Sequence, residues 1–203
     1  MQPLILLAGA YLLGAIPFGL LVSKLKGAPD PRSVGSGNIG ATNVVRSAGW
    51  AAGLLTLALD IAKGYVAVTL TARLTASEDP LWPAAAALAV MLGHVFPVFL
   101  RFRGGKAVAT AVGAYFALAP LPLTGSLVIF AATVAVSRYI SLGSILAASS
   151  FPLFWWWYAR PPAPVLAAAI LSALLIVWRH AANIGRLRAG TESRLGSRGG
   201  GRP

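Results

Sequence analysis

Long uncharged stretches constrain the fold of this chain more than any other feature. They extend over residues 1–23, 47–59, 80–100, 107–137, 139–159 and 161–178. Several reach the roughly 20 residues that a helix needs to cross a hydrocarbon core of about 30 Å. They lack the polar face that a surface helix of a soluble domain carries, so a soluble all-helical core is the weaker alternative. The sequence therefore predicts an all-α integral membrane protein.

The breaks between these stretches predict seven transmembrane helices. They cover residues 3–23, 48–73, 81–99, 106–119, 123–137, 141–159 and 163–180. The division of 107–137 rests on Pro120 and Pro122, because each proline removes a backbone donor and favours a turn. With seven spans, fourteen Lys and Arg residues lie on one side and two on the other, whereas six spans give eight on each side. Because positive residues gather on the cytoplasmic side, we expect seven spans, the N-terminus outside and the C-terminus cytoplasmic.

The remaining composition limits the domain organisation and the chemistry. We expect one seven-helix domain over residues 1–192 and a disordered, Gly- and Arg-rich tail over 193–203. The net charge of +12 resides in short loops and in this tail, with no nucleic-acid motif, so no nucleic-acid partner is expected. The chain has no cysteine, which excludes disulfides and thiolate nucleophiles. Five scattered acids and two histidines form no convincing cation site, so we expect neither a metal nor a cofactor.

The first polar stretch is VGSGNIGATNVVR, residues 34–46. Gly35, Gly37 and Gly40 match G-x-G-x-x-G, but a dinucleotide fingerprint needs a preceding strand, and a membrane helix is predicted here. Glycines let backbone N–H groups approach an anion closely, and the guanidinium of Arg46 is suited to phosphate. Neutral hydrogen-bonding groups come from Ser36, Asn38, Thr42 and Asn43. We interpret the stretch as an anion-binding loop, with a flexible connection between helices as the alternative.

The second polar stretch is GHVFPVFLRFRGGKAVAT, residues 93–110, in which basic residues surround Gly104 and Gly105. A Gly-Gly-Lys sequence that opens a helix is suited to bind an anion, because exposed N–H groups, the positive helix end and the Lys106 ammonium coincide. It is not a Walker A loop, since positions 100 and 107 are Leu and Ala. The alternatives are interfacial anchoring by the basic residues and a purely structural, hydrogen-bonded role for His94.

The third polar stretch, residues 178–196, contains both titratable and amide side chains. His180 and Asn183 are three residues apart and share a face if the helix continues, and Glu192 is the single acid of the stretch. A basic membrane-proximal tail is the alternative interpretation. Asp60 and Lys63 lie inside the second predicted span, also three residues apart, and we expect them to form a structural ion pair rather than to act directly in catalysis. The predicted topology places all three polar stretches on the cytoplasmic face, where they can meet.

Together these stretches resemble the bacterial acyl-phosphate:glycerol-3-phosphate acyltransferases, integral membrane enzymes that make lysophosphatidic acid. The resemblance covers most of the chain and rests on GAIPFG (14–19), GSGNIGATNVVR (35–46), residues 60–64, GHVFPVFLRFRGGKAVAT (93–110) and residues 183–192. It implies a seven-helix fold in the bacterial inner membrane, with the active site on its cytoplasmic face. The implied reaction moves an acyl group from acyl phosphate to the 1-hydroxyl of glycerol 3-phosphate and releases phosphate, without acyl-CoA or acyl carrier protein as the direct donor.

The residue roles follow from this resemblance and from the phosphate that both substrates carry. Glycerol 3-phosphate is expected to bind Ser36, Arg46, Lys106 and Asn183, with His180 nearby. Gly104 and Gly105 would face the acyl phosphate. The pocket would be completed or braced by Gly37, Asn38, Gly40, Thr42, Asn43 and His94. Glu192 would orient an arginine rather than attack the substrate.

The mechanism expected from these residues is direct attack of the glycerol hydroxyl on the acyl carbon. The chain has no cysteine, and neither histidine is followed by aspartate at the fifth position, so the His-x4-Asp dyad of other glycerolipid acyltransferases is missing. The base is either His180 or a phosphate oxygen of a substrate. The rival functions are a transporter of phosphate-bearing solutes or lipids and a scaffold that binds anionic lipid. Besides the two substrates, the expected partner is the lipid bilayer, and no obligatory protein partner is evident.

Overall fold

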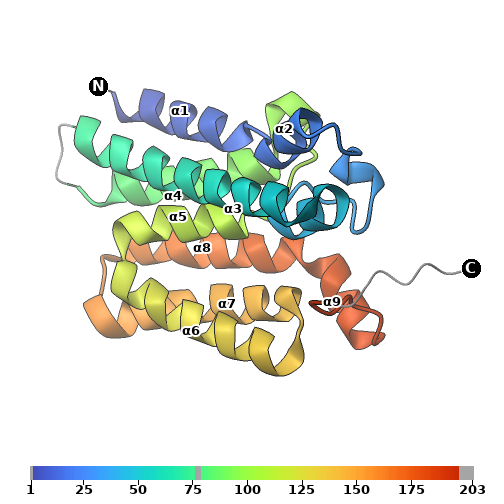
Figure 1. Ribbon diagram of the computed structural model, residues 1–203. Coiled ribbons are helices and arrows are strands. Elements are labelled where there is room, and N and C mark those ends of the chain that lie inside the picture. The colour runs from blue at the N-terminus through green and yellow to red at the C-terminus, as the bar shows by residue number, and fades with distance from the viewer. Residues whose placement is uncertain (1, 76–78, 197–203) are drawn as a thin grey trace, which may run out of the picture. The chain divides into compact units, whose positions relative to one another are not determined.

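The computed structural model describes residues 2–75 and 79–196, and within them it contains helices and no strand. Two compact units divide the chain at residue 119 (Figure 1). The first unit contains α1 (Pro3–Ala15), α2 (Phe18–Leu25), α3 (Ala41–Leu74), α4 (Leu81–Val95) and α5 (Val108–Leu118), with short 3-10 turns at Pro31–Ser33 and Val98–Leu100. The second unit contains α6 (Pro120–Ser137), α7 (Ile140–Ala159), α8 (Ala163–Arg179) and α9 (Ala181–Arg188). The fold is therefore all-helical, as the sequence predicts.

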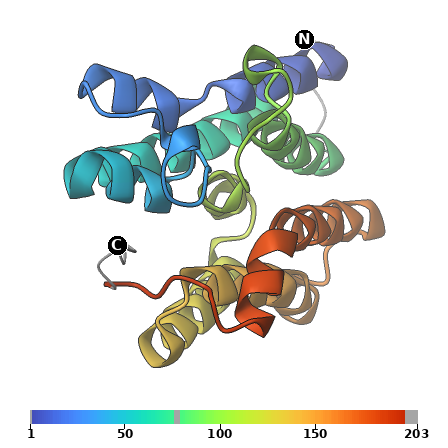
Figure 2. The same cartoon turned by 90° about the vertical axis from the view of Figure 1, so that its right-hand side faces the viewer.

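Close helix packing in the first unit depends on positions without a side chain. A Cβ atom on Gly14 of α1 would collide with the backbone of Val90 on α4, and one on Gly93 of α4 would collide with that of Tyr11. Helices α3 and α5 approach each other in the same way, at Gly64 and Gly113. Because each glycine faces backbone rather than a flexible side chain, these two helix pairs are held at a fixed distance. Figure 2 shows this unit from the side.

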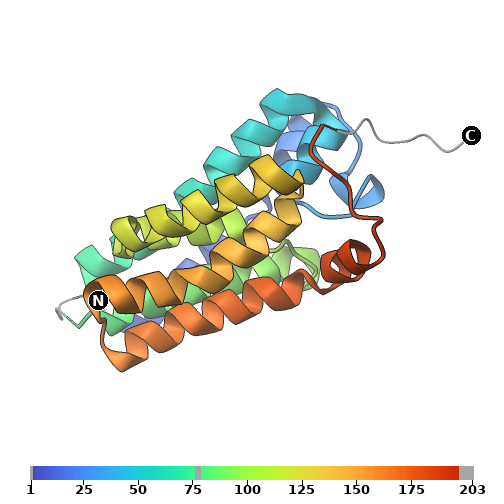
Figure 3. The same cartoon turned by 90° about the horizontal axis from the view of Figure 1, so that it is seen from below.

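The second unit is built on α6, α7 and α8. Helix α7 packs against both of its neighbours in sequence, and Figure 3 shows the three helices running alongside one another. After α8, the chain bends by 54° into the short helix α9. Residues 191–196 then run back to the α6–α7 connection, where the Leu195 N–H donates to the Arg138 carbonyl at 2.7 Å. The remainder of the predicted tail, residues 197–203, lies outside the described residues.

Helix length and composition identify the chain as a membrane protein. In the described residues, five helical segments are long and apolar enough to cross a bilayer: Pro3–Leu25, Ala41–Leu74, Leu81–Leu100, Pro120–Ser137 and Ile140–Ala159. The bent pair α8 and α9 makes a sixth if it is counted as one span. The predicted fourth span corresponds to α5, which has 11 residues and falls below this length. The count of seven and the orientation of the termini stay predictions.

Local backbone features explain where the helices differ from their predicted bounds. The first span is broken between α1 and α2, at Ile16 and Pro17. The second, predicted from residue 48, corresponds to the part of α3 that follows a kink at Gly49, where φ is 85°, and residues 41–48 form a further helical segment before the kink, with Gly40 as the N-cap. The predicted break in 107–137 is confirmed: α5 ends at Leu118, and α6 begins at Pro120, so both prolines fall in its first turn, where no donor is needed.

Candidate active site

The loop between α2 and α3 is organised around the buried side chain of Asn43. Its Nδ2 lies 2.6 Å from the Pro31 carbonyl, 3.0 Å from that of Val34 and 2.8 Å from that of Asn38. Its Oδ1 accepts a hydrogen bond from the Ser36 N–H at 3.0 Å. One amide from the first turn of α3 therefore fixes most of the preceding loop.

The same loop and the first turns of α3 expose the polar groups that the sequence assigns to substrate. The side chains of Ser36, Thr42 and Arg46 are all exposed, as is Gly37. Asn38 is half-buried, and its Oδ1 accepts from the Gly40 N–H at 2.8 Å, just before α3 begins. The loop and the start of α3 thus present two hydroxyls and a guanidinium near the N-terminus of α3, whose first N–H groups have no partner within the helix. This arrangement can bind a phosphate group.

The Gly-Gly-Lys turn corrects one sequence-based expectation. The backbone N–H groups of Gly104 and Gly105 were expected to be exposed for an anion. Instead they donate to the carbonyls of Val95 at 3.1 Å and His94 at 3.0 Å, at the end of α4. The reason is that the last carbonyls of a helix need donors, and the returning turn supplies them. Lys106 is half-buried beyond this turn and precedes α5.

His94 is buried, with 5% of its surface exposed. Its Nδ1 lies 3.1 Å from Thr110 Oγ1 and 3.6 Å from Asp60 Oδ1. The predicted ion pair is confirmed beside it, with Lys63 Nζ 2.8 Å from Asp60 Oδ1. His94 therefore contacts buried ionisable groups on one side and the Gly104–Lys106 turn on the other.

Glu192 connects the tail to two helices of the second unit. Its Oε1 accepts from Asn183 Nδ2 and from Ser141 Oγ, each at 2.7 Å, and its Oε2 accepts from Arg186 Nε at 2.7 Å. Burial alone would raise the pKa of Glu192, but the hydrogen bonds from Asn183, Ser141 and Arg186 outweigh it and hold the pKa below its usual value. The carboxylate is thus ionised and orients an arginine, as predicted. Sequence analysis missed Ser141, which lies 51 residues away along the chain.

His180 sits at the bend between α8 and α9 and is 2% exposed. Its Nδ1 lies 2.8 Å from the carbonyl oxygen of Ile176. A carbonyl only accepts hydrogen bonds, so Nδ1 carries the proton and, in the neutral ring, the lone pair resides on Nε2. This tautomer suits a general base acting through Nε2.

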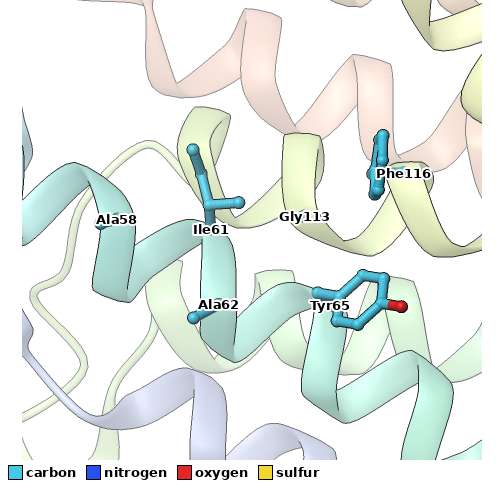
Figure 4. Close-up of a pocket in the computed structure, with 6 residues that line it drawn as sticks. All are labelled: Ala58, Ile61, Ala62, Tyr65, Gly113 and Phe116. Carbon is cyan, nitrogen blue, oxygen red and sulfur yellow. The ribbon is translucent and has the colours of Figure 1, made fainter.

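A shallow apolar hollow of about 480 Å³ lies on the first unit between α3 and α5 (Figure 4). It is lined by Ala58, Ile61, Ala62, Tyr65, Gly113 and Phe116. None of the predicted site residues reaches it, so it adds no polar group to the candidate site. Within residues 2–75 and 79–196, no group of three or more His, Cys, Asp or Glu side chains is placed to hold a metal ion.

The structure groups the predicted residues by unit. In the first unit it brings His94 against Gly104 and Gly105, and it joins Asn43 to Ser36 and Asn38. In the second unit it joins Asn183 to Glu192, with His180 at the start of the same helix. The roles of these residues toward a substrate stay predictions.

The sequence model of the family described as "Glycerol-3-phosphate acyltransferase" matches residues 4–190. Several relatives carry that name. The one from Geobacter sulfurreducens is 49% identical over 195 residues, which cover 96% of this chain and 98% of its own. The one from Trichlorobacter lovleyi is 52% identical over 189 residues, covering 93% and 95%.

Two solved structures are also similar along nearly the whole chain. Both are crystal structures of PlsY (YgiH), an integral membrane glycerol 3-phosphate acyltransferase. The glycerol 3-phosphate form has a TM-score of 0.91 and 42% identity, and the lysophosphatidic acid form has 0.87 and 40%. Each alignment covers 97% of both chains.

Proposed function

The chain belongs to the glycerol-3-phosphate acyltransferase family, and from this premise we propose that it acylates the sn-1 hydroxyl of glycerol 3-phosphate with acyl phosphate as the donor. The products are 1-acylglycerol 3-phosphate and phosphate. The observation that carries the proposal is the similarity to one protein solved in a glycerol 3-phosphate form and in a lysophosphatidic acid form. The two molecules differ by one acyl group, so they are the acceptor and the product of this transfer.

Exposed cationic and hydroxyl groups of the first unit support binding of the acceptor. We assign the phosphate of glycerol 3-phosphate to Ser36, Arg46 and Lys106, since a guanidinium can bind phosphate with two parallel hydrogen bonds and an ammonium adds a point charge. Ser36 lies on the loop that Asn43 holds, and Arg46 lies on α3, three residues after Asn43, so both groups are ordered before the substrate arrives. Binding then costs less conformational entropy than ordering a mobile loop would.

Hydrogen bonding in the second unit supports a role for Asn183 toward the acceptor. Because Asn183 Nδ2 donates to the Glu192 carboxylate, the amide is fixed with its Oδ1 directed away from that carboxylate. An oriented carbonyl oxygen can accept a hydrogen bond from a glycerol hydroxyl. Glu192 therefore acts by positioning Asn183 and Arg186, and it does not touch the substrate itself.

The donor is assigned to the Gly104–Lys106 turn. The Lys106 ammonium neutralises the charge of the bound phosphate. The N–H groups of Gly104 and Gly105 donate to carbonyls at the end of α4. The turn therefore binds the phosphate through the ammonium and through the positive start of α5 rather than through the glycine amides.

The transfer proceeds by direct attack, without an acylated protein. The glycerol oxygen bonds to the acyl carbon, the bond from that carbon to the phosphate oxygen breaks, and the electron pair leaves with phosphate. The hydroxyl proton goes either to His180 Nε2 or to a phosphate oxygen of a substrate. Cationic groups stabilise the developing oxyanion and the leaving phosphate, and alignment of two bound substrates supplies a large share of the rate. We place this site on the cytoplasmic face of the bacterial inner membrane.

The test uses purified protein in detergent with acyl phosphate and labelled glycerol 3-phosphate. Phosphate release that requires both substrates, with label appearing in lysophosphatidic acid, is expected. Acyl-CoA and acyl carrier protein loaded with the same acyl group serve as control donors and should give no product. Product from either control, or no product from acyl phosphate, would refute the donor assignment. The transporter alternative predicts movement of phosphate compounds across sealed vesicles and no ester formation.

A further inference from the structure

A cluster of ionisable side chains lies buried in the first unit, and one of its members, His94, contacts the Gly104–Lys106 turn. Asp60, Lys63 and His94 are 2%, 3% and 5% exposed. Lys63 Nζ and His94 Nδ1 lie 2.8 Å and 3.6 Å from the same oxygen, Asp60 Oδ1. Burying charged groups at this depth carries a large desolvation cost, and a buried pair is weak support for stability by itself. The cluster therefore calls for a role other than holding the fold together.

The cluster connects several helices at one place. Lys63 Nζ donates to the carbonyl of Ile16 at 3.1 Å, where the chain breaks between α1 and α2, and it lies 5.6 Å from the ring centre of Phe18. His94, on α4, reaches Thr110 on α5 at 3.1 Å. The imidazole is thus held on its Nδ1 side by groups from α3 and α5, so its rotamer is fixed.

The opposite edge of the fixed imidazole faces the Gly104–Lys106 turn. A Cβ atom at position 105 would collide with Nε2 of His94, and Cδ2 and Cε1 of that ring are its next neighbours. Neither Gly104 nor Gly105 has a positive φ, so neither position needs glycine for its backbone conformation. Gly105 is therefore required by the space that the ring occupies. Gly104 differs, because its Cβ would collide with the backbone carbonyls of His94 and Val95.

We propose that His94, held in place by Asp60 and Lys63, is a positioning residue that sets the Gly104–Lys106 turn for acyl phosphate. This inference rests on the proposed function, since it assigns the turn to the donor. The ring lies between the buried ion pair and Gly105 and holds the turn in place. The carbonyl of His94 fixes the backbone of Gly105 from the same residue, through the 3.0 Å hydrogen bond. The buried charges thus control where the Lys106 ammonium lies without touching a substrate.

A double-mutant cycle tests the contact. Gly105→Ala should lower kcat/KM for acyl phosphate by about 100-fold, because a displacement of about 1 Å in a positioned group is enough for such a loss. His94→Asn keeps an atom near Nδ1 but removes Nε2 and Cε1. The double variant should therefore regain about tenfold or more over Gly105→Ala alone, which is non-additive behaviour. Gly104→Ala is the matched control, and His94→Asn should not rescue it, because the obstacle there is backbone.

Two further readouts separate positioning from general destabilisation. A displaced turn raises the KM for acyl phosphate, whereas partial unfolding lowers the apparent kcat at an unchanged KM. If the two substitutions lower kcat/KM independently, so that their effects multiply in the double variant, the proposal is wrong. Equal rescue of Gly104→Ala by His94→Asn would also overturn it. The melting temperatures of the same proteins should couple in the same way, since they report the contact of ring and turn directly. If the wild-type protein lacks transfer activity, the proposed function is refuted instead. The coupling of melting temperatures would then still show whether the His94 ring and the turn are in contact.

Discussion

The strongest stability prediction concerns Asn43→Asp. The change keeps the acceptor for the Ser36 N–H but replaces Nδ2 with a second carboxylate oxygen, which then faces the carbonyls of Pro31, Val34 and Asn38. Because Nδ2 carries two hydrogens, about two full hydrogen bonds are lost. Each leaves a carbonyl without its partner at a cost of about 1–3 kcal/mol, so the loop should lose about 2–6 kcal/mol.

The assay combines thermal unfolding in detergent with amide hydrogen exchange over residues 31–43. We expect a lower melting temperature and faster exchange at Ser36, together with a higher KM for glycerol 3-phosphate. Asn38→Asp is the matched control for stability, because Asn38 Oδ1 acts as an acceptor from the Gly40 N–H and a carboxylate can replace it. Equal stability of the two variants would show that Asn43 does not organise this loop.

Three other predictions use the remaining polar groups. Lys106→Ala should remove nearly all turnover while Lys26→Ala leaves it near wild type, measured as phosphate release; equal losses would mean that basicity in general, not a placed ammonium, matters. Because the folded-state pKa of Glu192 is depressed, its stabilising effect is present above its usual value of 4.5 and is lost as pH falls through the folded value. Melting of Glu192→Gln should therefore depend less on pH in that acidic window than wild type does, and identical pH profiles would contradict the assignment. Single cysteines at positions 36, 106 and 183 of this cysteine-free chain should all be labelled by an impermeant thiol reagent from the cytoplasmic side, whereas labelling from opposite sides would refute the predicted topology.

The sequence predicted the class of fold because long apolar runs leave few alternatives. It placed a break at residues 120–122 because prolines lack a backbone donor, and the structure has that break one step earlier, at Ala119, with both prolines in the first turn of α6. It missed the helical segment before the kink in α3, because residues 41–47 are polar, which is typical of a loop. Gly40 provides an extended N-cap for this segment, and the non-helical backbone of Gly49 separates it from the rest of α3. Polarity marks the end of a membrane-embedded segment, and it does not mark the end of a helix.

In the candidate site, contacts between residues that are far apart in the sequence could not be predicted. The pair Asp60 and Lys63 could be predicted because a helix places residues three apart on one face. No such rule joins Ser141 to Glu192, or His94 to Asp60, since tertiary packing alone brings them together. The expected exposure of the Gly104 and Gly105 amides failed because the sequence gives no sign that the end of α4 will return to meet them.

The G-x-G-x-x-G match at residues 35–40 shows how one pattern arises from different physics. Gly35 and Gly37 have φ of 59° and 67°, which favours glycine, and a Cβ at position 35 would lie 2.5 Å from Asn43 Oδ1. Gly40 is instead an extended N-cap with φ of −76°, a conformation that any residue adopts. In a dinucleotide-binding turn the third glycine serves packing of a helix on a strand, and no strand precedes this loop within residues 2–75. The first two glycines here serve a tight loop that closes on an asparagine, so only the sequence pattern, and not the structure around it, resembles a nucleotide site. The phosphate binding that we propose depends instead on Ser36, Arg46 and the start of α3.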